Sequence, residues 1–547
     1  MKRMICLLAA LLLLSACAGP TLPPQPEANM PKPPESPGDF SEAQKPGVMP
    51  PGPVISQNQP ITVPEIVIAP LTGTELFSNR DYEDAYNADA SRIVLQGETA
   101  SCTDASVIVA EGRITITEKG TYILSGRLNA GMVIIDTDKK AKVQLVLENA
   151  DIHSKTSAAI YVAQADKVFL TLAENTENSL SNGGSFVPVD DSNIDAAIFS
   201  RDDLTINGSG YLRVRSPAGH GIVSKDEVTI TGGEIAIEAD AHGITGEDCV
   251  CIDSAILDIQ CGKDAIQAEC ETDAAKGFFY LAEGTVHCDA GDNGIRTTGT
   301  LQIDGGNLTL ETTGDALHSD LDVIINGGAI TVSTEDDGIH ADNVLSVRNG
   351  AVHIHRSYEG LEAKSILVAG GEVSLISQDD GLNAAGGKDQ SGFGGHQGGD
   401  RFHMGDDSCI LISGGSLKIN AAGDGMDSNG GLFITGGNTV VEGPADAGNG
   451  PLDYSGVGML SGGILLATGS VEMAQSLIPQ GQGVLFVSTG RQTGGTTIEI
   501  LDMDGNVLLS ACPAKSFACI VASCQDIHSG QTYRVAVNGA VTELRAQ

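Results

Sequence analysis

Acidic and amide side chains recur at fixed positions through the second half of this sequence. Each stands two residues before an Ile, Leu or Met, with Gly or Ala between them in most cases. This first set contains Asp264, Asn293, Asp315, Asp337, Glu359, Asp380 and Asp424. A second set follows the same apolar residues by one position and contains His318, His340, Glu362, Asn383, Asp427 and Asp453. If the repeats stack on one another, each set forms a column of closely spaced polar groups.

Such a column predicts a cation site. Stacked carboxylates repel one another and raise one another's pKa unless solvent or a cation compensates their charge. Carboxylate and amide oxygens suit calcium better than zinc. The predicted calcium ligands are Asp315, Asp320, Asp336, Asp337, Asp342, Glu359, Glu362, Asp379, Asp380, Asp424 and Asp427. The residues predicted to contact a ligand beside them are His318, His340, Asn383, Lys364, Asp453 and Tyr454.

We expect these side chains to point outward, at a turn or a strand edge. An alternative is that the columns are Asp- and Asn-rich turns that bind nothing, because these residues tolerate turn conformations.

The elements that would position these columns follow from the spacing. The dominant step between the apolar residues is 22 residues, with longer steps around residues 269–277 and 385–406. The apolar residues are Ile198, Ile222, Ile244, Ile266, Ile295, Leu317, Ile339, Leu361, Leu382, Met426 and Leu452. Between them, alternating β-branched residues joined by Gly-Gly or Asn-Gly pairs predict short strands. Strand repeats that cannot each bury a core must stack on one another.

We therefore predict an all-β fold, a right-handed parallel β-helix with about 22 residues per coil. At a coil spacing of about 4.8 Å, the repeat region has room for roughly 13 coils and a length of about 60 Å. A propeller needs about 40–50 residues per blade and fits the period poorly.

The ends of the chain differ from the repeat. We expect a signal peptide at residues 1–16 and a lipidated Cys17 with a Pro-rich tether over residues 17–64. An N-terminal β cap at residues 65–131, the β-helix at 132–470 and a small C-terminal β cap or sandwich at 471–547 complete the chain. Lys2, Arg3 and the short apolar run that follows are typical of a signal peptide. Leu14-Ser15-Ala16-Cys17 resembles the bacterial lipoprotein box, which implies export and lipid anchoring to the outer face of the bacterial cell membrane.

Composition narrows the possible partners. The 547 residues include 69 Gly and no Trp, and the formal net charge is −40. So acidic a protein is not expected to bind nucleic acid, and the missing Trp argues against a site that stacks neutral sugars. We expect a monomer that touches the membrane only through its lipid.

Ten Cys remain after Cys6 and Cys17, and their pairing cannot be read from spacing.

Several segments resemble one known family, the carbohydrate-binding β-helix proteins of clostridia and related gut bacteria. These segments are Asp336–Ala341 (DDGIHA), Asp379–Gly386 (DDGLNAAG), Gly423–Gly430 (GDGMDSNG), Gly448–Tyr454 (GNGPLDY), Ser200–Leu204 (SRDDL) and Cys512–Ser516 (CPAKS). The resemblance covers roughly residues 75–547. It implies a pectate-lyase-like fold and binding of calcium and of an acidic polysaccharide such as polygalacturonate. The sequence departs from the family pattern at Tyr358–Glu362 and in its number of Cys.

These observations predict a cell-surface lipoprotein that binds an acidic polysaccharide through calcium, without catalysis. One alternative is a calcium-dependent polysaccharide lyase, for which Lys364, two residues after Glu362, is the best candidate base. A second alternative is a structural adhesin or stalk. The insertion at residues 386–405 is either a lip over the ligand groove or a surface loop.

Overall fold

A computed structural model of the chain describes residues 61–384 and 407–547, all within one compact unit. The described chain is almost entirely β, which confirms the predicted class. Its helices are α1 (Gly73–Leu76) and the 3-10 helix η1 (Asn79–Tyr82). Neither is long and apolar enough to span a membrane.

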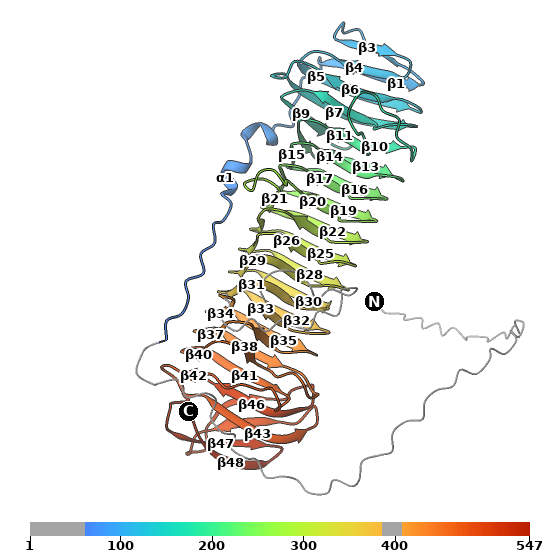
Figure 1. Cartoon of the computed structure of the whole chain (residues 1–547). Coiled ribbons are helices and arrows are strands. Elements are labelled where there is room, and N and C mark those ends of the chain that lie inside the picture. The colour runs from blue at the N-terminus through green and yellow to red at the C-terminus, as the bar shows by residue number, and fades with distance from the viewer. Residues whose placement is uncertain (1–60, 385–406) are drawn as a thin grey trace, which may run out of the picture. The chain divides into compact units, whose positions relative to one another are not determined.

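Most strands belong to one 44-stranded sheet in which a strand pairs, parallel, with its counterpart one repeat later (Figure 1). The strands form three series. The first series is β1 (Ser91–Gly97), β5 (Gly120–Leu128), β7 (Lys142–Ser154), β10 (Glu177–Asn182), β13 (Tyr211–Ser216), β16 (Glu234–Ala239), β19 (Ala255–Cys261), β22 (Gly284–Ala290), β25 (Asn307–Thr312), β28 (Ala329–Thr334), β30 (Ala351–Ser357), β32 (Glu372–Ser377), β35 (Ser416–Ala421), β38 (Asn438–Glu442) and β41 (Ile464–Gly469).

The second series carries the apolar motif residues. It is β4 (Arg113–Ile116), β6 (Met132–Asp136), β8 (Ile160–Gln164), β11 (Ala196–Ser200), β14 (His220–Ser224), β17 (Ile244–Gly246), β20 (Ile266–Ala268), β23 (Ile295–Thr297), β26 (Leu317–Ser319), β29 (Ile339–Val347), β31 (Leu361–Val368), β33 (Leu382–Ala384), β36 (Met426–Ser428) and β39 (Asp453–Tyr454).

The third series shares β7, β29 and β31 with the other two. Its remaining strands are β9 (Lys167–Leu172), β12 (Asp203–Gly208), β15 (Glu227–Ile230), β18 (Cys249–Ile252), β21 (Phe278–Leu281), β24 (Leu301–Ile303), β27 (Asp322–Ile325), β34 (Cys409–Ile412), β37 (Gly431–Ile434), β40 (Gly458–Leu460) and β42 (Ile478–Pro479).

The predicted register is present in the pairing. Ile244 lies opposite Ile266, Leu317 opposite Ile339, and Ile339 opposite Leu361. These residues join one continuous buried cluster that runs through all three series. Where glycine precedes the apolar residue, it leaves room for the next repeat: a Cβ on Gly338 would lie 2.5 Å from the Gly360 carbonyl oxygen.

Antiparallel strands flank the parallel series at both ends. At the start, β2 (Ala100–Ser101) pairs with β1, and β3 (Val107–Ala110) pairs with β4. At the end, β46 (Phe517–Ser523) pairs with both β41 and β43 (Leu485–Gln492). A separate antiparallel sheet contains β44 (Ile498–Leu501), β45 (Val507–Ala511), β47 (Thr532–Val537) and β48 (Ala540–Arg545).

Residues 61–87, which we call the N-terminal strap, lie along the outside of the third series (Figure 1). The strap runs against the order of the coils. Ile61 and Val63 pack on the cluster that contains Phe433 and Met459, whereas Phe77 packs on Cys249, Cys251 and Tyr280. Cys249 and Cys251 pack against the strap outside the main core cluster and are buried by it. All ten Cys in the described residues are free thiols.

Candidate functional site

The first polar column forms a ladder in which the side chain of one coil accepts a hydrogen bond from the backbone of the next. The Asp315 N–H donates to Asn293 Oδ1 (2.9 Å), and the Asp337 N–H donates to Asp315 Oδ1 (3.0 Å). The Glu359 N–H donates to Asp337 Oδ1 (3.1 Å). The same bond joins Asn293 to Asp264 (3.0 Å) and Asp424 to Asp380 (2.6 Å). Asp264, Asn293, Asp315, Asp337 and Asp380 thus each satisfy a backbone donor of the next repeat.

The side chains of the first column are less exposed than their expected outward orientation suggests. Asp264, Asn293, Asp315, Asp337 and Glu359 are all buried. The backbone gives a physical reason for four of them, because Asp264, Asn293, Asp315 and Asp337 each accept the backbone N–H of the next repeat. A purely structural role, the alternative to a cation site, therefore accounts for one oxygen of each of these side chains. The role of the second carboxylate oxygen has to be considered separately.

Asp337 lies at the centre of the ladder with one oxygen unused. Oδ1 accepts the Glu359 N–H, whereas Oδ2 is buried and has no hydrogen bond. His340 Nδ1 lies 3.9 Å from this Oδ2. Burial raises the pKa of Asp337 well above its ordinary value, and the nearby acids Asp315, Glu359 and Glu362 raise it further.

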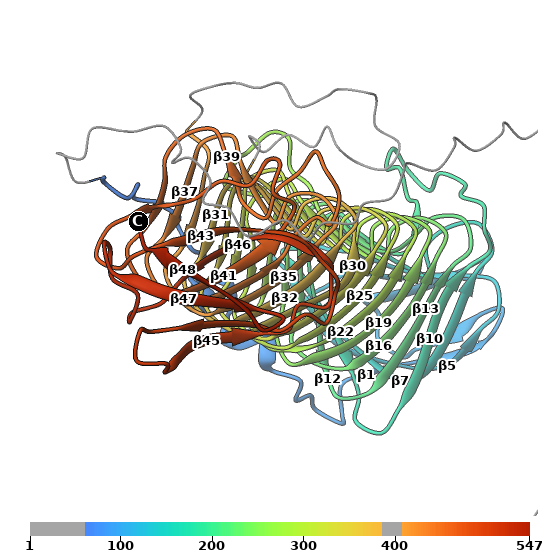
Figure 2. The same cartoon turned by 90° about the horizontal axis from the view of Figure 1, so that it is seen from below.

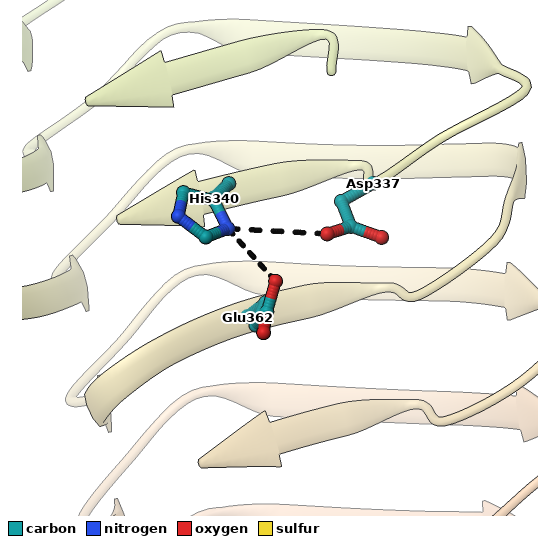
Figure 3. Close-up of side chains that lie close together, drawn as sticks. All are labelled: Asp337, His340 and Glu362. Atoms are coloured by element: carbon teal, nitrogen blue, oxygen red, sulfur yellow. Dashed lines mark hydrogen bonds and ion pairs between the residues drawn. The ribbon is translucent and has the colours of Figure 1, made fainter. Parts of the chain in front are cut away.

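His340 lies close to three carboxylates from two repeats: Asp337 and Glu362, which Figure 3 shows, and Asp342. Its Nδ1 is 2.8 Å from Glu362 Oε2, and its Nε2 is 3.2 Å from Asp342 Oδ1. Burial opposes a charged imidazole here, but the hydrogen bonds to Asp342 and Glu362 outweigh it and raise the pKa of His340 to about 11. A charged His340 therefore compensates part of the acidic cluster.

His318 occupies the same position one coil earlier. Its Nδ1 is 2.7 Å from Asp315 Oδ2 and its Nε2 is 2.9 Å from Asp320 Oδ1. Burial is again outweighed, by the bonds to Asp315 and Asp320, and the pKa of His318 rises to about 8. The His318 and His340 rings stack with centroids 4.8 Å apart and an angle of 9° between their planes.

Two groups of side chains bring three possible metal-ligating atoms within 4.8 Å of one another. One is Asp337, His340 and Glu362; the other is Asp315, Asp336 and Asp337. The second offers only oxygen, which fits calcium, whereas the imidazole in the first fits a transition metal better. Asp337 belongs to both groups, and its Oδ2 is buried without a hydrogen bond.

The remaining predicted residues continue the columns away from this centre. Asn383 Nδ2 donates to Glu359 Oε2 (2.7 Å), and Asn383 Oδ1 is buried without a hydrogen bond. The Tyr358 hydroxyl donates to Asp379 (2.9 Å). Burial raises the pKa of Asp380 well above its ordinary value, with Glu359 and Asp424 adding to the effect.

At the far end, Asp453 Oδ1 accepts a bond from Gln475 (2.5 Å) and the Tyr454 hydroxyl donates to the Ser476 carbonyl. Asp427 lies opposite both Asn383 and Asp453 in the strand register, and it is half-buried. Lys364 is half-buried on β31 and has no hydrogen bond or ion pair among the described residues. Cys17 and residues 386–405 lie outside the part of the chain that the structure describes.

The ladder also extends to two histidines that the sequence prediction missed. His220 and His242 stand at the same place before Ile222 and Ile244, and their rings stack at 5.0 Å. The His242 N–H donates to His220 Nδ1 (3.3 Å), and His242 Nδ1 lies 3.1 Å from Asp264. Both histidines stand two residues before an Ile, as the acids of the first column do, so their spacing in the sequence already places them in this column.

Comparisons with known proteins give one family. A family model described as “Carbohydrate-binding domain-containing protein” matches residues 110–360. A protein of the same description from Acetivibrio thermocellus is 30% identical over 208 residues, which cover 38% of this chain and 73% of that protein. Among solved structures, a polysaccharide lyase-like protein from C. thermocellum, a gadolinium derivative, is 26% identical with a TM-score of 0.36. That match covers 54% of this chain and 96% of the other.

Proposed function

Since the chain belongs to the family of carbohydrate-binding domain-containing proteins, we propose that it binds an acidic polysaccharide, such as polygalacturonate, through calcium and without catalysis. The observation that carries this proposal is the buried Oδ2 of Asp337, which has no hydrogen bond and lies in an all-oxygen group with Asp315 and Asp336. A calcium ion there compensates carboxylates that otherwise have to hold protons.

Calcium also resolves a conflict of charge. A protein with a formal net charge of −40 repels a uronate polymer, and a divalent cation held by protein carboxylates supplies the missing attraction. The outer members of the columns, Asp320, Asp342 and Asp427, are only half-buried, so they are placed to share a cation with sugar carboxylates.

The proposed architecture is a right-handed parallel β-helix in which the three strand series form the faces of successive coils. Its support is the pairing of each strand with the strand one repeat later, together with the single buried cluster that all three series enclose. We further propose that the chain is exported and held at the outer face of the cell membrane by a lipid on Cys17.

Binding to immobilised polygalacturonate tests this function. We expect the full chain to bind at millimolar calcium and to lose most of its affinity in a chelator, with no binding to a neutral galactan under either condition. Retention of the full affinity in the chelator would contradict the calcium mechanism. No binding to any sugar on a glycan array with calcium present would favour a structural adhesin.

A lyase remains the second candidate because of Lys364. This amine lies two residues after Glu362 on β31 and has no ion pair among the described residues, so it is available as a base beside the acidic columns. Incubation with polygalacturonate and calcium separates the candidates. Growth of the ultraviolet absorbance of unsaturated uronates in the native protein, and its loss in Lys364→Met, would establish the lyase.

A further inference from the structure

Positive charge is concentrated in the early coils. Residues 92–225 contain 13 Lys and Arg against 16 Asp and Glu, a net charge of −3, whereas the rest of the chain carries −37. The acidic columns lie in the later coils, from Asp264 to Asp453. The early coils are therefore the part of the molecule that repels an anion least.

A hollow of about 390 Å³ opens on the first strand series in these early repeats. Strands β5, β7, β10 and β13 lie side by side there, as Figure 2 shows. Its lining contains Arg127, Asp151, His153, Ser179, Ser181, Asn182, Arg213, Arg215 and Pro217. We propose that this hollow binds a uronate residue of the polysaccharide directly, with its arginines on the sugar carboxylate and without a metal ion.

The strand register explains why the hollow exists. Ser179 lies between Asp151 and Arg213, and Ser181 lies between His153 and Arg215, in two parallel rows across the strands. Two short serine side chains flanked by long ones leave a depression in the sheet surface. The serine hydroxyls form its floor and offer hydrogen bonds to sugar hydroxyls, while the longer side chains form its walls.

The charges on the walls leave an excess for an anion. Arg213 and Arg215 share one acid, Glu238, and Arg215 Nε lies 2.8 Å from it. Arg127 pairs with Asp151 at 3.3 Å. Three guanidinium groups thus face two carboxylates. Each guanidinium carries five donors, so those not used by Glu238 and Asp151 remain for a carboxylate, which arginine binds in a bidentate geometry.

A second hollow of about 190 Å³ begins where β7 ends. His153 lines the first hollow, and the next two residues, Ser154 and Lys155, line the second together with Arg113. Glu111 is the one acid in the lining of the second hollow, so each hollow has more basic than acidic side chains. Two such hollows suit successive residues of a polymer better than one isolated ion. The size of the first lies within the range of about 300–1,000 Å³ typical of small-ligand sites.

This inference rests on the proposed function, because it assumes that the ligand is an acidic polysaccharide. The test therefore measures binding of an oligogalacturonate to the full chain at low salt in a chelator, where a calcium route contributes nothing. We expect the native chain to retain measurable affinity there, and the double variant Arg213→Gln/Arg215→Gln to lose about ten-fold of it. The methyl-esterified oligosaccharide, which lacks the carboxylate, is expected not to bind.

Two further variants separate binding from folding. Ser181→Tyr fills the hollow without changing its charge and is expected to weaken binding as much as the double variant. The control Arg356→Gln/Arg534→Gln removes two exposed arginines that are each paired with one glutamate, and it is expected to bind as the native chain does. The melting temperature of every variant is measured, so that a loss of binding is separated from a loss of folding.

The results distinguish failure of the metal-free subsite from failure of the proposed function. Loss of all native binding in the chelator, or unchanged binding by both hollow variants, would overturn the metal-free subsite. If binding then persists in calcium, the proposed function stands without this subsite. If binding is absent in calcium as well, the proposed function fails too.

Discussion

The two carboxylate oxygens of Asp337 have different surroundings. Asp337 gives Oδ1 to the backbone of the next coil and buries Oδ2 without a hydrogen bond. An asparagine at this position keeps the first role and loses the charge that the second requires. The two roles are therefore separable by one substitution.

We predict that Asp337→Asn loses the stabilisation that calcium gives. In a chelator its melting temperature is expected to equal or exceed that of the native chain, because the amide oxygen still accepts the Glu359 N–H and no buried carboxyl has to be neutralised. For a cation at 100 times its Kd, the native chain gains about 2.7 kcal/mol, and the variant gains far less. Thermal unfolding with calcium and with chelator measures both, with exposed Asp258→Asn as control. An equal calcium shift in both variants would remove Asp337 from the site.

His220 gives the molecule a separate dependence on pH. The pKa of His220 is lowered from 6.5 to about 4, mainly by burial and to a smaller extent by the neighbouring His242. Because the unfolded chain binds the proton more readily, the stability from a neutral His220 is complete above pH 6.5 and is lost as the pH falls toward 4. The difference is at most about 3 kcal/mol, reduced by the partial exposure of the ring.

The variant His220→Asn tests this, since its Oδ1 still accepts the His242 N–H and does not titrate. Denaturant unfolding between pH 7 and 4 is expected to show a shallower loss of stability in the variant than in the native chain. His355→Gln, at an exposed position, is the matched control. Parallel curves for the native chain and His220→Asn would show that the ring is not held neutral.

At the scale of elements, the sequence predicted what repeats and missed what does not. The two-residue alternation and the 22-residue step were sufficient for the strands, and Ile339 pairs with Leu361 as expected. The burial of Asp337 was not foreseen because the step shows which residues align but not which backbone N–H needs an acceptor. The sequence predicts a Pro-rich tether up to residue 64 and an N-terminal β cap from residue 65, so the strap is divided between them. Residues 61–87 contain no repeat, and a non-repeating segment does not show what it covers.

The strap is anchored to the coils by Asp81, whose substitution we expect to destabilise the chain. This buried carboxylate accepts a bond from Thr205 Oγ1 (2.7 Å) and lies 3.0 Å from the ammonium group of Lys167, itself largely buried. Burial raises the pKa of Asp81, but bonds from Ser78 and Thr205 outweigh it and lower the pKa below its ordinary value. In Asp81→Ala, the ion pair left to Lys167 among the described residues is the longer one with Glu227, at 3.8 Å.

We therefore predict a loss of about 2–4 kcal/mol in the free energy of unfolding for Asp81→Ala. Limited proteolysis is expected to cleave the variant within residues 61–87 sooner than the native chain. The exposed Asp84→Ala is the control for both measurements. Native resistance to the protease in Asp81→Ala would mean that the apolar contacts of Phe77 and Ile61 hold the strap without this ion pair.

At the scale of the whole molecule, the net charge of −40 divides into a nearly balanced early region and a strongly acidic remainder. Exposed charges in the remainder repel one another over distances that salt screens, with a Debye length of about 10 Å at 0.1 M. The buried ladder is screened much less, because solvent ions do not enter it. Salt and calcium should therefore stabilise the chain by different routes.

This separation predicts two independent responses. In a chelator, raising NaCl from about 0.05 to 0.5 M is expected to increase the melting temperature gradually, since it weakens repulsion between exposed acids. At constant ionic strength, about 1 mM calcium is expected to add a saturable increase that NaCl does not reproduce. Magnesium is expected to add less, because it demands a smaller octahedral set of ligands.

Asp337→Asn should keep the NaCl response and lose the calcium response, which makes it the internal control. Equal increases with calcium, magnesium and ionic-strength-matched NaCl would reduce the calcium effect to screening. The acidic columns would then stabilise the coil corners alone, and the attraction of an acidic polysaccharide would have to come from the arginine-lined hollow of the early coils.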